Sequence, residues 1–427
     1  MKFYRETEFQ ETEIGKIPRD WRIAKLKDVA EIRGNKKLTR NIRNVTFIPM
    51  EAIPDNKIYT QYEIRDIREA KSFVYCEPGD ILLAKITPSF ENGKQGIVPL
   101  DIPGNFALAT TEVYPIKCKD IDTFYLFYLL KFSPNRNKLK SLMRGTTGRR
   151  RVPRDALEML TVPIPPRNEQ QKIAEILSTV DRAIENIDNA IARLERLKKA
   201  LMGELLAGRI RVKDVDGKLT FYRETEFQET EIGKIPTDWR IAKLGEIAES
   251  RKEIVYPQQE ESSTPYVGLE HIMSGEIRLR RFGNISDVRS AKMKFYKGDI
   301  LYGKLRPYLD KAVLANIDGV CSTDIIVIKT KKDIIPEFLI YVLHSKKFIK
   351  HAISTMRGTN HPRTSWESIA RFKIGVPPLQ EQRKIAEILS AVDRTIELYI
   401  NERGKLEKVK NGLMSVLLTG KVRVRDD

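Results

Sequence analysis

Residues 3–26 read FYRETEFQETEIGKIPRDWRIAKL, and residues 221–244 repeat this stretch with a single difference, Thr237 in place of Arg19. Further on, each half of the chain carries a second repeated stretch, so the order of segments is A-B-A′-B′. The spacing between the two copies, from residue 3 to residue 221, is far longer than the repeat period of solenoids or propellers. The sequence therefore predicts a tandem protein of two related halves.

The second repeated stretch has the pattern of a long helix. PPRNEQQKIAEILSTVDRAIE from Pro165 matches PPLQEQRKIAEILSAVDRTIE from Pro377, and each run ends at a glycine, Gly208 or Gly420. Apolar residues recur in steps of three and four, which indicates a coiled-coil seam on a helix of about 40 residues. The predicted seam consists of Ile173, Leu177, Val180, Ile184, Ile187, Ile191, Leu194, Leu197, Leu201 and Leu205 in the first copy, and of Ile385, Leu389, Val392, Ile396, Tyr399, Leu406, Val409, Leu413 and Leu417 in the second, where Arg403 replaces Ile191.

Each seam needs a partner, because an isolated apolar stripe would face water. The simplest partner is the other helix of the same chain, packed antiparallel. The chain termini then meet, and the protein becomes a nearly cyclic object with an approximate two-fold axis. A coiled coil between two molecules is an alternative that the seam alone does not distinguish.

The stretches between the repeats, about residues 20–160 and 238–372, are called the variable regions. They share only sparse landmarks: GDIL at Gly79 and Gly298, a Thr-acid pair at Thr111-Glu112 and Thr323-Asp324, and MRGT at Met143 and Met356. Runs such as VTFIPM, GDILLAKI, TPYVGLEHI, GDILYGKL and TDIIVIK predict strands. FYLFYLLKF from Phe124 and EFLIYVLHSKKF from Glu337 predict an apolar helix in each region, and helical spacing favours core packing over base stacking. The predicted fold class is therefore mixed α/β, with two α+β regions joined by two long antiparallel helices.

The composition narrows the class of protein. Of 427 residues, 41% are hydrophobic and 31% charged, which excludes a disordered chain. Lys and Arg total 76 against 58 Asp and Glu, and a net charge of +18 favours nucleic acid as a partner. We find no apolar run of about 20 residues and no signal peptide, so we expect a cytoplasmic protein without a membrane span. Cys76, Cys118 and Cys321 form no C-x-x-C pair and predict neither disulfides nor a zinc site.

Motifs of common enzyme classes are absent from the sequence, including phosphate-binding loops, H-E-x-x-H and nucleophile elbows. One loose pattern, Asp55 followed by Glu69 and Lys71, resembles the core of a metal-dependent nuclease. The corresponding stretch of the second half, around Ser274 and Val288, lacks these acids. The pattern therefore gives only a minor hypothesis, with no catalytic or metal-binding residue predicted.

Basic clusters lie near the end of each variable region and after each GDIL run. The residues expected to contact DNA are Lys85, Arg144, Thr146, Arg149, Arg150 and Arg151 in the first half, and Lys304, Arg306, Arg357, Thr359, Asn360, His361 and Arg363 in the second; Thr147, Arg154 and Thr364 belong to the same clusters. Arginine can donate two hydrogen bonds to guanine, and asparagine can pair with adenine. Phosphate contacts are the alternative for each single residue.

A constant frame with two unlike variable regions predicts recognition of a DNA sequence in two different parts with an unread spacer. A helix of this length spans roughly 60 Å, which is under two turns of B-form DNA at about 34 Å each.

At this point the sequence resembles the specificity (S) subunits of type I restriction-modification systems. The resemblance lies in I-G-x-I-P-x-x-W at Ile14 and Ile232, G-D-I-L, the L-R-P-Y-L stretch at Leu305, P-P-x-x-E-Q-x-x-I-A at Pro165 and Pro377, G-T near the end of each variable region, and the L-L-x-G ending. It covers essentially the whole chain and keeps the order of the motifs.

The resemblance implies target-recognition domains at residues 1–162 and 213–374 and conserved coiled-coil helices at 163–212 and 375–427. It implies that the chain binds double-stranded DNA without catalysing a reaction. Two methyltransferase (M) subunits would dock on the frame, and motor-nuclease (R) subunits would complete the restriction complex. S-adenosylmethionine, Mg²⁺ and ATP would belong to those partners, and this chain would hold no cofactor.

Three other hypotheses stay open on the sequence alone. The chain could be a stand-alone bipartite DNA-binding protein such as a repressor, a metal-dependent nuclease acting through Asp55 and Glu69, or a structural coiled-coil connector whose charge is incidental.

Overall fold

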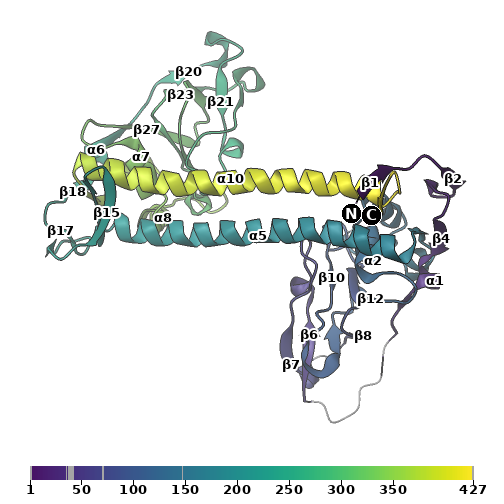
Figure 1. The fold of residues 1–427 in the computed structure, drawn as a ribbon. Coiled ribbons are helices and arrows are strands. Elements are labelled where there is room, and N and C mark those ends of the chain that lie inside the picture. The colour runs from purple at the N-terminus through teal and green to yellow at the C-terminus, as the bar shows by residue number, and fades with distance from the viewer. Residues whose placement is uncertain (1, 35, 37–42, 70–71, 147, 426–427) are drawn as a thin grey trace. The chain divides into compact units, whose positions relative to one another are not determined.

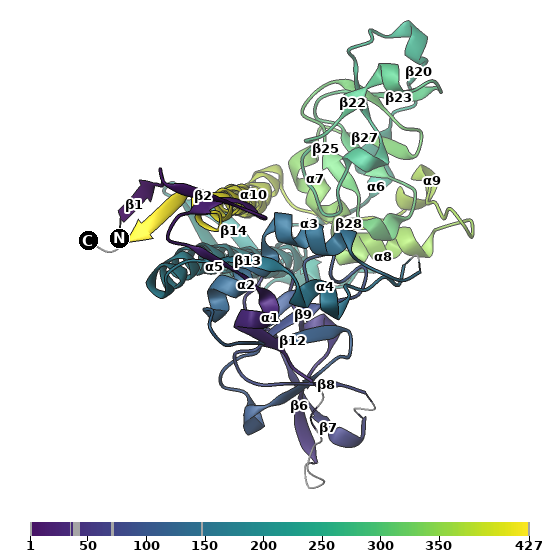
Figure 2. The same ribbon diagram turned by 90° about the vertical axis from the view of Figure 1, so that its right-hand side faces the viewer.

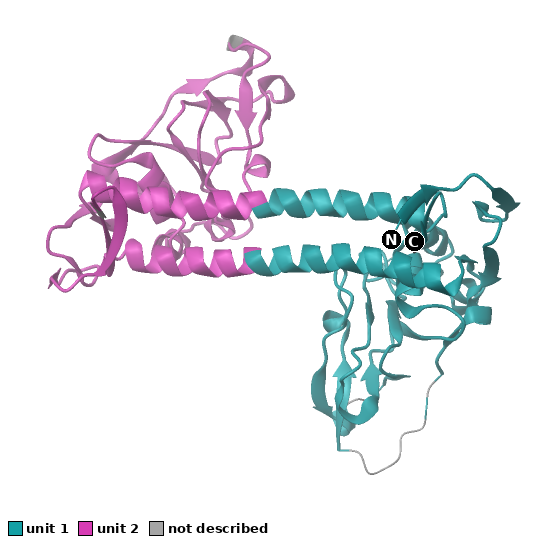
Figure 3. Cartoon of the chain, viewed as in Figure 1, with its two compact units in different colours: residues 1–190, 399–427 teal, residues 191–398 magenta. Residues whose placement is uncertain are grey.

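The computed structural model describes residues 2–34, 36, 43–69, 72–146 and 148–425 (Figure 1). The chain divides into two compact units, unit 1 of residues 1–190 and 399–427 and unit 2 of residues 191–398 (Figure 3). Within the described residues, no helix has the length and apolar character needed to cross a membrane.

Two helices of 39 residues each, α5 (Arg167–Leu205) and α10 (Leu379–Leu417), contribute to both units. In unit 1 Lys410 lies 2.5 Å from Asp181, and Arg403 donates to Asp188 at 2.5 Å. Since the residue numbers rise along one helix as they fall along the other, the two segments run antiparallel. This arrangement agrees with the predicted antiparallel pair of long helices from one chain.

The seam is apolar at the start of α5 and at the end of α10, whereas ion pairs interrupt it next to Leu197 and Val409. Ile173, Leu177 and Leu417 are fully buried, as predicted. Leu197 and Val409 are 48% and 50% exposed, so the prediction of a buried seam was wrong at these two positions. The next residue in each case, Lys198 or Lys410, forms an ion pair with an aspartate of the opposite helix, and polar contacts take the place of apolar packing there.

Each variable region contains two small sheets. In unit 1 the strands are β5 (Ala30–Ile32), β6 (Asn44–Ile48), β7 (Glu63–Asp66), β8 (Val74–Cys76), β9 (Ile81–Ala84), β10 (Gln95–Ile97), β11 (Ala107–Ala109) and β12 (Val113–Cys118), in the orders β10-β9-β12-β5 and β7-β6-β11-β8. In unit 2 they are β19 (Ala248–Ser250), β20 (Ile254–Val255), β21 (Pro265–Val267), β22 (Gly283–Asn284), β23 (Lys292–Phe295), β24 (Ile300–Gly303), β25 (Ala312–Leu314), β26 (Gly319–Cys321) and β27 (Ile325–Thr330), in the orders β19-β27-β24-β25 and β20-β23-β26-β21-β22. The five runs predicted as strands each overlap one of these strands.

An apolar helix packs each variable region against the start of a long helix. In α2 (Thr123–Lys131) and α7 (Pro336–Leu343) the central residues are buried in the same cores as Ile173 and Ile385, respectively, as predicted. The helix predicted from Glu337 is in fact two helices, α7 and α8 (Lys346–Ser354). The break occurs because the Ser345 side chain accepts a hydrogen bond from the Phe348 amide and caps the second helix.

The two chain termini meet in unit 1. Strand β1 (Lys2–Arg5) pairs antiparallel with β29 (Val422–Arg425), with Phe3 opposite Val424 (Figure 2). In unit 2, β14 (Ile210–Val215) and β15 (Lys218–Arg223) form the same pairing as a continuous hairpin, with Phe221 opposite Val212. The N-terminal strand therefore pairs with β29 as β15 pairs with β14 in the other half.

A buried arginine holds each of these junctions together. In unit 1 Arg423 donates to both carboxylate oxygens of Glu169, in the first turn of α5, at 2.7 and 2.8 Å. It donates further to Asp20 at 2.7 and 2.9 Å and to Glu6 at 2.5 Å, while the Trp21 indole donates to Glu169 at 3.1 Å.

Unit 2 repeats this cluster. Arg211 donates to both oxygens of Glu381 at 2.6 and 2.8 Å, to both oxygens of Asp238 and to Glu224. Burial by itself would lower the pKa of Arg211 and Arg423, but hydrogen bonds to the carboxylates outweigh it and raise both pKa values. Each guanidinium therefore remains charged at any pH at which the protein folds.

Replacing Arg423 with alanine is expected to lower the free energy of unfolding of unit 1 by about 3–5 kcal/mol, because buried carboxylates lose their cation. Chemical denaturation measures this loss. The control is Arg425→Ala, since Arg425 is exposed and its guanidinium lies 3.9 Å from the centre of the Tyr4 ring; the loss in this variant should stay under about 1 kcal/mol. Equal losses in the two variants would contradict this role of Arg423.

Candidate nucleic-acid interface

The basic cluster of unit 1 forms a tight hairpin. Arg144 and Arg151 exchange backbone hydrogen bonds of 2.9 and 2.8 Å. Gly145 has φ +127°, and a Cβ at this position would lie 2.8 Å from the Arg149 carbonyl oxygen, so the turn requires glycine. The hairpin also joins the loop after β9, since Val152 N donates to Lys85 O at 2.8 Å and Thr87 N to Arg150 O at 2.9 Å. Residues 85–90 and 144–151 are called the first loop pair.

An ion pair fixes the first loop pair to the sheet. Arg151 donates to both carboxylate oxygens of Glu112 at 2.9 and 2.7 Å, and the hydrogen bond from Arg151 is the main cause of a lowered pKa at Glu112. Lys85 lies beside this pair with its ammonium group 4.9 Å over the Tyr114 ring. Burial lowers the pKa of Lys85.

Unit 2 contains the same arrangement, the second loop pair, residues 304–310 and 357–363. Arg357 and Arg363 exchange backbone hydrogen bonds of 2.9 Å, and Arg363 donates to Asp324 at 2.8 and 3.1 Å, which lowers the pKa of Asp324. Thr364 N donates to Lys304 O, and Arg306 N to Pro362 O. These contacts correspond one for one to those of unit 1.

The shared hydrogen bonds align the two loop pairs and show where their side chains differ. Thr87 aligns with Arg306 because each donates its amide to the opposite loop, and Arg150 aligns with Pro362 as the acceptor. By the same register Ser89 aligns with Tyr308, and Arg149 with His361. One backbone frame thus presents two different sets of side chains.

The structure divides the predicted DNA-contacting residues into two groups. Ten of them are exposed, and seven of these form no ion pair with any described residue: Thr146, Arg149, Arg306, Arg357, Thr359, Asn360 and His361. Arg151 and Arg363 are held by the acids described above, and Arg144 and Arg150 lie 3.5 and 3.4 Å from Asp155 and Glu91. Lys85 and Lys304 are half-buried at the base of the loops. Thr147 lies outside the described residues, and Thr364 is buried.

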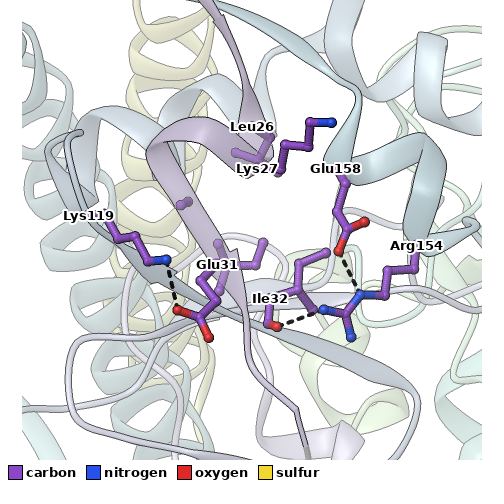
Figure 4. Close-up of a pocket in the computed structure, with 9 residues that line it drawn as sticks. Leu26, Lys27, Glu31, Ile32, Lys119, Arg154 and Glu158 are labelled. Carbon is purple, nitrogen blue, oxygen red and sulfur yellow. Dashed lines mark hydrogen bonds and ion pairs between the residues drawn. The ribbon is translucent and has the colours of Figure 1, made fainter.

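The acids Glu112 and Asp324 were not predicted to act in these loops. Their Thr-acid pairs were noted only as landmarks. The available signal was spacing, because each acid precedes its arginine by 39 residues in both halves. Arg154, the last arginine of the first cluster, donates instead to Glu158 at 2.7 Å and to the Ile32 carbonyl at 3.0 Å, at the edge of a pocket of about 110 Å³ (Figure 4).

The residues of the nuclease hypothesis do not form a metal site in the described part of the chain. Asp55 lies in a loop, where its carbonyl oxygen accepts from Lys131 at 2.8 Å, and Glu69 ends a short 3-10 helix, η2 (Ile67–Glu69). Lys71 lies outside the described residues. Among those described, no group of three or more His, Cys, Asp or Glu side chains could hold a metal ion.

Arg151→Ala is expected to loosen the first loop pair, because it removes the ion pair to Glu112 that holds the hairpin. Hydrogen-deuterium exchange at the amides of Arg144 and Val152 should accelerate while the rest of unit 1 stays protected. Arg149→Ala is the matched control, since this exposed arginine lies in the same loop. Accelerated exchange in both variants, or in neither, would refute the anchoring role of Arg151.

Comparisons with known proteins give one consistent result. The family model described as "Type I restriction modification DNA specificity domain" matches residues 18–196 and 236–411. The putative type I restriction enzyme MjaX specificity subunit of Methanocaldococcus jannaschii is 29% identical over 441 residues, covering 100% of this chain and 99% of the relative. The EcoDI specificity subunit of Escherichia coli is 26% identical and covers 94% of this chain and 88% of the relative.

Solved structures share the fold. A crystal structure of a type I restriction-modification S subunit from M. genitalium has a TM-score of 0.55 at 17% identity and covers 93% of this chain and 96% of that one. A structure described as the structural basis underlying complex assembly and conformational transition of the type I R-M system has a TM-score of 0.56 at 17% identity and covers 95% of this chain and 99% of that one. The prediction of a non-catalytic specificity subunit is confirmed by these relatives. Because the family model matches more than half of the chain, the chain belongs to the type I restriction-modification DNA specificity family.

Proposed function

We propose that this specificity subunit recognises a double-stranded DNA sequence made of two unlike parts, one read by each loop pair, with a spacer that neither loop pair contacts. The supporting observation is the repeated loop frame, in which an Arg-acid ion pair and the same backbone hydrogen bonds present different side chains in the two units. Different side chains on one frame select different base edges.

The exposed loop residues are assigned to DNA contact, and the ion-paired arginines to loop geometry. Arg149 in unit 1 and Arg306, Arg357 and Asn360 in unit 2 are exposed and have the donors that base edges accept. Arg151 and Arg363 would have to give up bidentate ion pairs of 2.7–3.1 Å to reach a base. Their contribution is therefore to hold the loops in shape.

The repeated frame would serve the partner subunits. Residues 3–26 and 221–244 are almost identical and lie beside equivalent arginine clusters, so two copies of an M subunit could bind in equivalent ways. R subunits would join the restriction complex. S-adenosylmethionine, Mg²⁺ and ATP would be bound by those partners.

The variant Arg149→Ala, in the complex with M subunits, should lose specificity for one half of the target only. Mapping of adenine methylation in the host genome defines the two halves. Discrimination between the correct and a mutated base pair should then fall roughly 10- to 100-fold in one half, since a good base contact is worth about 1–3 kcal/mol. Binding assays at fixed salt measure this ratio.

The control is Arg182→Ala, which removes a positive charge from α5 outside the loops and should leave the discrimination of both halves unchanged. If the loop variant weakens both halves equally, Arg149 acts as a general phosphate contact, and the assignment of one half to unit 1 is wrong.

A further inference from the structure

The loop Lys304–Asp310 of unit 2 is held in a strained conformation. Arg306 and Asp310 have φ +50° and +51°, left-handed values that residues other than glycine rarely adopt. Between them lies the 3-10 helix η7 (Pro307–Leu309). Two such residues around a single turn keep it only because the surrounding structure fixes both.

Contacts at both ends maintain this conformation. The Arg306 amide donates to the Pro362 carbonyl at 2.8 Å, and Leu305 pairs with Arg363 in an antiparallel bridge. At the other end the Asp310 carboxylate lies 2.7 Å from Nδ1 of the buried His344. The tip of the loop is therefore rigid, and what it presents is fixed before any ligand binds.

The tip of this loop, residues Pro307–Leu309, exposes apolar side chains to solvent between basic residues. Pro307 is buried, whereas Tyr308 is 50% and Leu309 39% exposed. No hydrogen bond joins the Tyr308 side chain to any residue in the described parts of the chain. The exposed Arg306 lies two residues before Tyr308, and the hairpin joined to this loop carries the exposed Arg357.

The corresponding tip of unit 1 has no such surface. Ser89 takes the place of Tyr308, and the aromatic side chain that follows, Phe90, is only 1% exposed. The guanidinium of Arg136 covers the Phe90 ring at 4.7 Å and donates to the Phe90 carbonyl. An exposed aromatic ring at this position is therefore particular to the second loop pair.

We propose that Tyr308 and Leu309 determine specificity by packing against the 5-methyl group of a thymine in the half-site read by unit 2. This inference rests on the proposed function. The basic surroundings select a polyanion, and the thymine methyl is the apolar group that DNA exposes in its major groove. A rigid apolar tip loses little conformational entropy when it binds such a group.

Substitution of deoxyuridine for thymine tests the proposal, because it removes only the methyl group. Each thymine of the unit 2 half-site, on both strands, is replaced in turn, and affinity is measured with the full chain bound to its M subunits. At one position the wild-type protein should lose roughly fourfold in affinity, the equivalent of one buried methyl group at about 0.8 kcal/mol. The double variant Tyr308→Ala/Leu309→Ala should bind the thymine and deoxyuridine probes equally at that position.

Two further variants sharpen the result. Tyr308→Phe keeps the ring and should retain the sensitivity to deoxyuridine. Leu398→Ala removes a 68% exposed leucine from α10 in the same unit and should also retain it. The melting temperature of each variant confirms that it is folded.

Two outcomes overturn the proposal: wild-type affinity that is unchanged by deoxyuridine at every thymine, or a sensitivity that persists in the double variant. Failure of the proposed function is distinguishable, because scrambling the whole unit 2 half-site would then leave wild-type affinity unchanged.

Discussion

The buried arginines Arg211 and Arg423 are the constraint on which the rest of the fold depends. A guanidinium can leave water only where carboxylates accept its hydrogen bonds, and each of these arginines meets three. In unit 1 the acids come from the N-terminal segment and the first turn of α5, whereas Arg423 follows α10. The cluster therefore forms only if the end of one long helix reaches the start of the other, which defines the antiparallel pairing and the cyclic order.

A second repeated cluster ties each variable region to both helices. The hydroxyl of Tyr128 in α2 donates to Asp181 of α5 at 2.7 Å, and Lys410 of α10 binds the same carboxylate. Unit 2 repeats this with Tyr341, Asp393 and Lys198. Burial, followed by the nearby aspartate, raises the pKa of Tyr128, so its phenol stays protonated and donates. The same cluster therefore supports both variable regions, although their loops differ.

The sequence predicts the features that local pattern and repetition determine. The apolar period and the terminal glycines predicted both long helices, and the run around Tyr128 was recognised as core. Features that depend on tertiary contacts were missed. The partial exposure of Leu197 reflects an ion pair across two helices, and the role of Glu112 depends on an arginine 39 residues away. Neither contact produces a periodic pattern in the sequence, although the arginine-acid pair recurs at the same spacing of 39 residues in both halves.

A net charge of +18 attracts DNA but does not show which arginines read it. In each loop pair one arginine is bound to an acid through two hydrogen bonds, and the two units share this ion pair as well as the backbone hydrogen bonds of the loops. The units differ in their exposed side chains: unit 1 has Arg149 where unit 2 has His361, and unit 2 has Tyr308 where unit 1 has the half-buried Ser89. Since two unlike half-sites require a difference between the units, and a stable loop requires a common anchor, the division between anchored and exposed side chains follows from the function proposed for them.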